Sequence, residues 1–346
     1  MAYTTIDDPS AYFQTKLYTG NQTARSITFD GNTDMQPDWV WHKKRAEAQD
    51  HQMRDSVRGT NKVLYITSDA EDTNTRFTAF NSNGFSLDNA TTLNKTGMTW
   101  VTWNWKAGTS FTNDASSTSV GSLDSSGSVS TTAGFSIISW TNAGTSNETV
   151  AHGLGAVPKM IIIKSRNETA GWLTYHEAIG NTHALFLNNT GAKDDNAELF
   201  NDTSPTSTVF TTGVTGLLTG GSNLIAYCFA EKQGYSKIGS YTGTGSDVFI
   251  HTGFKVGWLL VKNADNTNGW LVIDTKRSPA NPQGKYIYAN AGSAEGTVTY
   301  GEFFSNGFGW KGTGSVAVNQ SDEKFIYYAI AENPFVTSTG VPATAR

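Results

Sequence analysis

Apolar and polar residues alternate with a period of two along much of this chain, and turn residues separate the resulting runs. Stretches such as NETVAHGLGAVPKMIIIKS, residues 147–165, carry turn signals roughly every 8–12 residues, as all-β sandwiches do. Only RAEAQDHQMRDS, residues 45–56, is helix-like, and its place between two strand signals favours a long turn. The pattern therefore predicts an all-β fold of short strands.

One pattern occurs three times along the chain. Apolar runs of strand type each close with a lysine, in WVWHK, MIIIK and WLLVK: Lys43, Lys164 and Lys262. Twelve residues after these lysines comes a polar residue: Asp55, His176 and Asp274. Equal spacing in three places predicts internal repeats.

Further motifs frame each copy. The motifs LYTG, SWTN and SYTG precede the three lysine-ended runs, and the aromatic strands WVTWNWKA, LIAYCFAE and FIYYAIAE close the units. These closing strands mix aromatic with small residues, which suits burial against an opposing curved sheet. Since about 100 residues are enough for a small two-sheet sandwich, we expect three tandem β-sandwich repeats.

The repeats divide the chain into five segments. We expect an N-terminal arm plus first sandwich, a linker, a second sandwich, a third sandwich and a C-terminal arm: 1–107, 108–133, 134–232, 233–333 and 334–346. The linker is rich in Gly, Ser and Thr, so we expect it to be flexible and the first sandwich to move on it. Almost no sequence separates the second and third sandwiches, which should pack as one rigid body.

Composition and charge exclude several classes of partner. The 346 residues carry a net charge of −5 with scattered Lys and Arg, which argues against nucleic acid and against an anionic membrane surface. The sequence has no apolar run long enough to span a bilayer and no signal peptide at its start. The single cysteine, Cys228, rules out an internal disulfide framework and is expected to be buried.

The first and third copies carry an Asp-x-x-Arg pair: Asp55 with Arg58, and Asp274 with Arg277. The second copy has His176 and Ile179 at these positions. An Asp and an Arg alone lack a nucleophile or a second carboxylate for catalysis. We favour a structural ion pair that ties a turn to a neighbouring strand by charge-assisted hydrogen bonds, over a ligand contact or a catalytic role.

Metal and cofactor sites are not predicted. The segment DGNTD places Asp30 and Asp34 at alternate positions, as a calcium loop does, but Met35 follows where that loop needs glycine. We expect a solvated turn, and the sequence leaves open whether Asp30 and Asp34 bind a cation. The six histidines show no metal spacing, so we expect no metal and no cofactor.

Aromatic residues beside turns are the stronger functional candidates. Sugar-binding surfaces stack pyranose rings on Trp or Tyr and surround them with polar side chains. Trp172, Trp270 and Trp310 lie beside Asn- or Gly-rich turns and are the candidate ligand-binding residues. The alternative is that each tryptophan caps the core of its own unit.

Several blocks of this sequence resemble a known family: TTIDDPSAYFQTKLYTGN, QPDWVWHK, DSVRG, WNWKAG and AENPFVTSTGVPATAR. They are similar to a repeated domain of unknown biochemical function that is abundant in tailed phages of marine bacteria. The resemblance covers essentially the whole chain and implies concanavalin-like or jelly-roll sandwiches in virion proteins of tails, fibres or other appendages. It brings no established catalytic residues, and His176 and Ile179 depart from its pattern.

The resemblance and the residues together leave three classes of function. We favour a non-enzymatic virion structural protein, a tail fibre or appendage component rather than a head decoration. A carbohydrate-binding module for host surface glycan and a glycan depolymerase are the alternatives. Concanavalin-like depolymerases carry alternating carboxylates on one strand, and no strand-like Glu-x-Asp-x-x-Glu occurs here.

The expected partners are other virion proteins, further copies of the chain, with a trimer favoured, and host surface glycan. The polar arms carry Tyr12, Phe13 and Phe335 as apolar anchors, so we expect them to dock on a neighbouring subunit. The expected location is the virion, after synthesis in the host cytoplasm.

Overall fold

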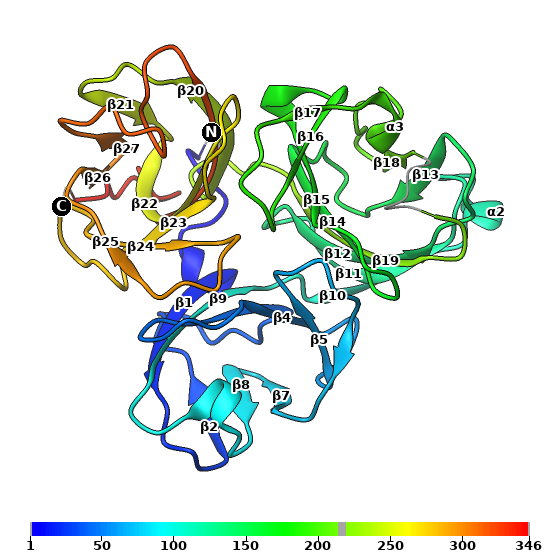
Figure 1. The fold of residues 1–346 in the computed structure, drawn as a ribbon, viewed down its shortest axis with the longest axis horizontal. Helices are drawn as coiled ribbons and strands as arrows, with labels where there is room; N and C mark the ends of the chain where they lie inside the picture. The colour runs from blue at the N-terminus through cyan, green and yellow to red at the C-terminus, as the bar shows by residue number, and fades with distance from the viewer. Residues whose placement is uncertain (1, 214–218, 345–346) are drawn as a thin grey trace.

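The computed structural model describes residues 2–213 and 219–344. This part of the chain is all-β, with antiparallel sheets joined by turns, as predicted (Figure 1). Its helical elements are single turns: η1 (Pro9–Ala11), α1 (Thr91–Asn94), α2 (Ala115–Thr118), η2 (Glu177–Ile179) and α3 (Ala197–Phe200). Among these residues, no helix has the length and apolarity that crossing a membrane requires.

The first strand group, β1 to β9, forms two sheets with the orders β1-β9-β3-β4-β5-β6 and β2-β8-β7. The helix-like stretch 45–56 contains no helix, but the expected long turn covers only its first part, since residues 52–55 form β4. The bounds are β1 (Phe13–Thr19), β2 (Arg25–Thr28), β3 (Trp39–Lys44), β4 (Gln52–Asp55), β5 (Lys62–Tyr65), β6 (Asp72–Thr73), β7 (Phe77–Asn81), β8 (Gly84–Leu87) and β9 (Thr99–Trp105).

The second strand group, β10 to β19, forms sheets with the orders β10-β11-β12-β19-β14-β15-β16-β17 and β13-β18. Its bounds are β10 (Thr109–Asn113), β11 (Ser125–Ser130), β12 (Phe135–Thr141), β13 (Glu148–Ala151), β14 (Met160–Ser165), β15 (Leu173–His176), β16 (His183–Phe186), β17 (Asp194–Asp195), β18 (Val209–Thr212) and β19 (Asn223–Phe229).

The third strand group, β20 to β28, forms sheets with the orders β20-β28-β22-β23-β24-β25 and β21-β27-β26. Its bounds are β20 (Ser236–Thr242), β21 (Val248–His251), β22 (Phe254–Asn263), β23 (Leu271–Asp274), β24 (Lys285–Tyr288), β25 (Gly296–Thr297), β26 (Gly301–Phe304), β27 (Gly307–Trp310) and β28 (Lys324–Pro334).

The larger sheets of the three groups share one strand order. In each, the opening strand pairs with the closing strand, which pairs with the lysine-bearing strand: β1-β9-β3, β12-β19-β14 and β20-β28-β22. The lysine-bearing strand then pairs with the strand that follows it. The three groups lie around a common centre in Figure 1.

The segment 108–133 is not a flexible linker, and that prediction is wrong. It forms β10, α2 and β11, and β11 pairs with β12 from Ser125 opposite Trp140 to Ser130 opposite Phe135. Thr, Ser and Val fit a pleated edge as well as a loop, and the sheet of the second group satisfies their backbone hydrogen bonds.

The core consists of four clusters, of which one is shared by all three groups. In the shared cluster the Trp39 and Tyr227 rings stack at 4.3 Å between the first and second groups. Phe229 and Tyr328 meet at 5.0 Å between the second and third groups. The shared core contradicts the expectation that the first group moves relative to the other two, because Trp39, Trp41, Trp103 and Trp105 belong to it.

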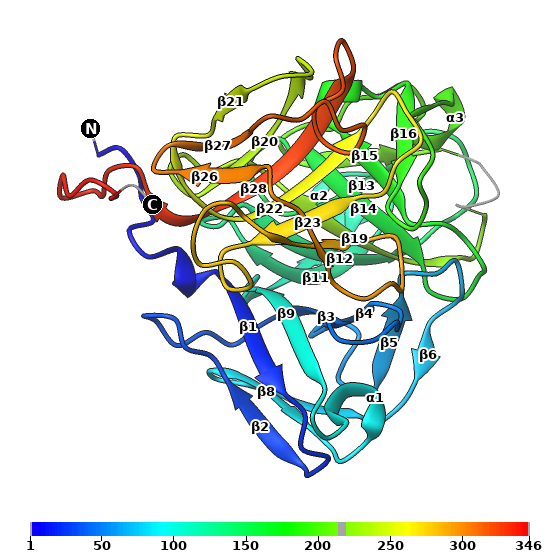
Figure 2. The ribbon, with the colours of Figure 1, turned by 60° about the vertical axis from the view of Figure 1, so that its left-hand side comes forward.

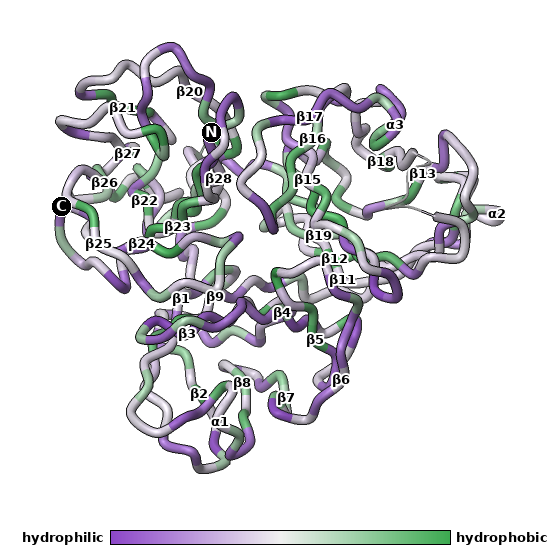
Figure 3. The backbone as a smooth tube through the Cα atoms, viewed as in Figure 1, coloured by the Kyte–Doolittle hydropathy of each residue, from purple (hydrophilic) through white to green (hydrophobic). Residues whose placement is uncertain are grey.

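The other three clusters lie within single groups, and Cys228 is fully buried in that of the second. Hydrophobic positions gather along central strands such as β14, β22 and β23, whereas many loops at the rim are hydrophilic (Figure 3). Each group thus has its own apolar core in addition to the shared one.

Candidate functional site

Three buried lysines join the strand groups in a closed ring. Each directs its Nζ atom to a backbone carbonyl of another group: Lys43 to Gly292 (2.8 Å), Lys164 to Ser68 (3.3 Å) and Lys262 to Thr190 (3.4 Å). The first group thus contacts the third, the second contacts the first, and the third contacts the second. Burial lowers the pKa of each lysine to about 8.

Further hydrogen bonds repeat around the same ring. Each of these carbonyls also accepts a backbone amide: Gly292 from Gln49 (2.7 Å), Ser68 from Ala170 (2.8 Å) and Thr190 from Asn268 (2.9 Å). A ring nitrogen eight residues after each lysine reaches the same neighbouring group: His51 to the Tyr288 carbonyl (3.1 Å), Trp172 to Tyr65 (3.0 Å) and Trp270 to Phe186 (3.0 Å). The lysine-ended motif is therefore a joint between groups.

The Asp-x-x-Arg pair of the first group lies at its joint with the second. Arg58 Nε donates to Asp55 Oδ2 at 2.6 Å, and the Tyr227 hydroxyl donates to the same oxygen at 2.7 Å. Arg58 also reaches Glu71 at 3.1 Å, and Glu71 accepts two hydrogen bonds from Arg166 of the second group. Burial lowers the pKa of Arg58, but the charges around it outweigh burial and raise it overall.

The pair of the third group repeats this arrangement at the joint with the first. Arg277 Nε donates to Asp274 Oδ2 at 2.6 Å, and Trp103 Nε1 donates to the same oxygen at 3.0 Å. Arg45 of the first group binds Glu295 through two hydrogen bonds of 2.8 and 3.0 Å. Arg277 lies 3.5 Å from Glu295 and completes the network.

A histidine replaces the ion pair at the joint between the second and third groups. His176 Nδ1 accepts from the Ala178 amide at 3.2 Å, which leaves Nε2–H to face the Tyr327 carbonyl at 3.4 Å. Burial lowers the pKa of His176 to about 4. An ion pair between Lys193 and Asp265 spans the same joint.

These pairs have no contact with solvent. The side chains of Asp55, Arg58, Asp274 and Arg277 are all 0% exposed. Every one of these charges faces another charge or a polar group of the protein. The geometry supports the structural interpretation, because a ligand could not reach these atoms without separating the strand groups.

All three candidate tryptophans are buried, so none presents an exposed ring to a ligand, although Trp310 also lines a cavity on β21, β27 and β26. Trp172 and Trp270 are fully buried and donate to backbone carbonyls across the joints. Trp310 is buried in the core of the third group, and its Nε1 donates to the Tyr241 hydroxyl at 2.7 Å. Asn- and Gly-rich turns flank these tryptophans because strands end there, which the sequence pattern does not distinguish from exposure.

The proposed arm anchors have different environments. Phe13 is buried against Trp105 and Trp258, and Tyr12 meets Tyr235 edge to face at 6.1 Å, so neither is free to anchor an arm. Only Phe335 remains exposed among the three. Phe13 is the first residue of β1 and Tyr12 precedes it, so pairing of β1 with β9 places both rings at the shared core.

The turn around Asp30 is tied to lysines. Asp30 pairs with Lys16 and with Lys276 at 3.3 Å each, and Asp34 accepts a hydrogen bond from Asn83. Both ammonium groups contact the Asp30 carboxylate, so a metal cation would have to compete with them for it. In residues 2–213 and 219–344, no three His, Cys, Asp or Glu side chains are grouped to hold a metal ion.

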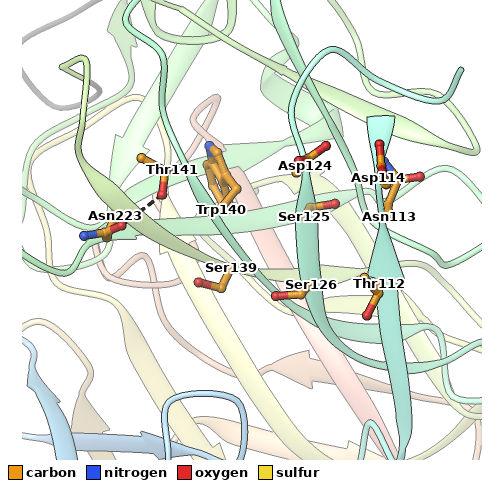
Figure 4. A pocket seen from close by; sticks show the side chains of 10 residues that line it. All are labelled: Thr112, Asn113, Asp114, Asp124, Ser125, Ser126, Ser139, Trp140, Thr141 and Asn223. Carbon is orange, nitrogen blue, oxygen red and sulfur yellow. Dashed lines mark hydrogen bonds between the residues drawn. The ribbon is translucent and has the colours of Figure 1, made fainter. Parts of the chain in front are cut away.

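The cavities on the surface of the described residues include the following three. A polar trough of about 330 Å³ lies over β10, β11 and β12, with Ser and Thr side chains along it (Figure 4). A cleft of about 420 Å³ between the first and third groups includes Asp30 and Lys276. A third, of about 330 Å³, lies on β21, β27 and β26 and includes Phe249. The sequence analysis missed Phe249. Alternation in VFIH places its side chain on the outer face of the strand, since the next residue, Ile250, is buried on the inner face.

Comparison with known proteins identifies a family. A family model with the description domain of unknown function (DUF7483) matches residues 8–334. No curated protein matches the sequence. The match includes every joint described above, and it ends before residues 335–344. The chain belongs to the family of domain of unknown function DUF7483.

Proposed function

We propose that the chain is a non-enzymatic structural protein of a phage virion, a tail fibre or appendage component that mediates assembly and host-surface contact. Three tandem β-sandwich repeats of jelly-roll or concanavalin-like type would build it. The shared strand order of the three larger sheets supports these repeats. The sequence blocks that resemble marine tailed-phage proteins support the location on the virion.

One structural observation carries the proposal: the two end segments pair into a projecting tab. We define the terminal tab as residues 2–8 and 335–344, which lie side by side at one edge of the molecule (Figure 2). The Ser338 amide donates to Asp7 at 2.6 Å, and Tyr3 meets Phe335 edge to face at 6.3 Å.

The terminal tab is anchored to the third strand group and carries two exposed apolar side chains. Thr4 donates to the Gln233 carbonyl at 2.9 Å, and Tyr3 donates to the Gly253 carbonyl at 2.5 Å. Phe335 is 36% exposed and Val341 60% exposed. A fixed projection with exposed apolar side chains suits insertion into a pocket of a neighbouring subunit or of another virion protein.

Assembly of several copies on one particle would also favour contact with the host surface. Several copies per particle, in a trimer for example, convert weak individual glycan contacts into useful avidity. The rigid joints support this role, since they hold any contact surface at a fixed angle to the terminal tab.

Deletion of residues 335–344 tests the proposal. The readouts are oligomeric state by light scattering and incorporation into purified particles by quantitative mass spectrometry. Val157→Ala is the control, because Val157 is also exposed, at 47%, but lies in the second group. The deletion should abolish incorporation and the control should not. Normal incorporation of the deleted protein would refute the role of the tab.

A further inference from the structure

The outer face of the sheet β21-β27-β26 contains a cleft floored by glycine. Phe249 lies opposite Gly309, and Gly309 lies opposite Glu302 on the other side. One residue pair further along β27, Gly307 lies between His251 and Phe304. Because Gly307 and Gly309 place no side chains on the outer face of the middle strand, the flanking residues form the walls of the cavity of about 330 Å³.

Two aromatic rings form the apolar part of these walls. Phe249 and Phe304 meet edge to face, with ring centroids 5.6 Å apart. A Cβ atom at Gly307 would lie 2.9 Å from the Phe249 ring, so the ring partly covers this glycine. This packing explains where Phe249 lies, but the side chain is still 50% exposed.

Charged groups form the rest of the rim. Asp247 accepts a hydrogen bond from the Gly312 amide at 2.7 Å, which holds its carboxylate at one end of the cleft. Lys311 lies 4.0 Å from Glu302, and both line the cavity. The cleft thus combines exposed aromatic faces with two carboxylates and an ammonium group.

We propose that this cleft binds a saccharide of the host surface. A pyranose ring has apolar C–H faces that would stack on Phe249 and Phe304, and hydroxyl groups that would hydrogen-bond to Asp247, Glu302 and Lys311. An apolar side chain of a partner protein would displace water from Asp247, Glu302 and Lys311 without offering them new hydrogen bonds, which disfavours it. The inference rests on the proposed function and names its ligand class.

The site requires no opening of the joints. Its ligand would approach the outer face of the third group, away from the buried Asp274 and Arg277. Loss of the site therefore need not alter stability or assembly, and the two proposals can be tested apart.

The experiment measures binding of neutral oligosaccharides by the full chain. The probes are hexasaccharides of α-1,4-, β-1,4- and β-1,3-linked glucose and of β-1,4-linked galactose, titrated by calorimetry and by chemical-shift changes at β21 and β27. The variants are Phe249→Ala, Phe249→Trp and Glu302→Gln. The control is Phe335→Ala, which truncates an exposed phenylalanine of the terminal tab.

We expect at least one probe to bind with shifts in β21 and β27. Phe249→Ala should weaken this binding roughly tenfold or more, because a stacking face and its apolar area are lost. Glu302→Gln should weaken it less, whereas Phe249→Trp and Phe335→Ala should retain it. Particle incorporation should be normal for Phe249→Ala, whatever happens to Phe335→Ala.

Three results would overturn the saccharide site. One is that none of the four probes binds. Another is that binding persists unchanged in Phe249→Ala and Glu302→Gln. The third is that Phe249→Ala blocks incorporation or changes oligomeric state, because the cleft is then a protein-docking surface. Failure of the full chain to enter particles would refute the proposed function without deciding the cleft.

Discussion

The Tyr227 hydroxyl donates a hydrogen bond to Asp55 Oδ2 at 2.7 Å, although the two residues belong to different strand groups. Both side chains are fully buried, and the same carboxylate oxygen accepts Arg58 Nε. This hydrogen bond therefore links the ion pair of the first group to β19, the closing strand of the second group. Trp103 and Asp274 repeat the relationship between the third and first groups.

Tyr227→Phe should destabilise the protein by about 1.5–3 kcal/mol, because a buried hydrogen bond to a charged group is lost. Tyr18→Phe is the matched control, since its hydroxyl donates to the neutral Leu93 carbonyl within the first group. The control should cost about 1 kcal/mol. Urea unfolding of both variants measures the difference, and equal losses would contradict a special role for the joint.

Arg277→Met should cost about 3–5 kcal/mol, because it leaves the buried carboxylate of Asp274 without its charged partner. Lys95→Ala removes half of an exposed ion pair with Glu47 and should cost at most about 1 kcal/mol. The double variant Asp274→Leu with Arg277→Met should recover part of the loss, since no isolated charge remains. If Arg277→Met lowers the free energy of unfolding no more than Lys95→Ala does, the Asp274–Arg277 pair does not stabilise the joint between the third and first groups.

The shared core predicts that the three strand groups unfold together. Tryptophan fluorescence, to which all three groups contribute, and far-ultraviolet circular dichroism should give coincident urea transitions. Limited proteolysis under native conditions should spare residues 109–130, because β10 and β11 are paired into the second group. Early cleavage in that segment, with release of a stable first group, would restore the flexible-linker hypothesis.

Buried histidines predict loss of stability in mild acid. Burial lowers the pKa values of His42, His51 and His176 in the folded state, so the unfolded chain binds more protons below about pH 6.5. The stability contribution is fully present above pH 6.5 and is lost as the pH falls toward 4. For His176 alone the loss is at most about 3 kcal/mol. His176→Gln should flatten the dependence of the urea midpoint between pH 7 and pH 4.5, and an unchanged slope would contradict this account.

The sequence predicts the strands well because their signals are local. Alternation, turn residues and the three lysine-ended runs follow from the chemistry of neighbouring positions. The Asp-x-x-Arg motif also has a local part, since Arg58 and Arg277 bind the aspartate three residues before them. These features need no knowledge of the rest of the chain.

Contacts between groups could not be predicted, because they join residues far apart in sequence. Trp172 and Trp270 sit beside turns whether they face solvent or a neighbouring group, so only the arrangement of the groups decides their burial. The segment 108–133 has the composition of a linker, and only the available edge of β12 makes it a pair of strands. The cleft beside Phe249 could not be predicted, because it forms only where Gly307 and Gly309 of β27 lie between β21 and β26 in the folded sheet.

The central claim is that this chain is carried on a phage particle as an appendage component. The most direct measurement is gold labelling of purified particles with antibodies against the chain, followed by electron microscopy. Label confined to tails, fibres or other projections is the predicted result. Particles that contain no copy of the chain, with the protein left in the lysate, would contradict the claim.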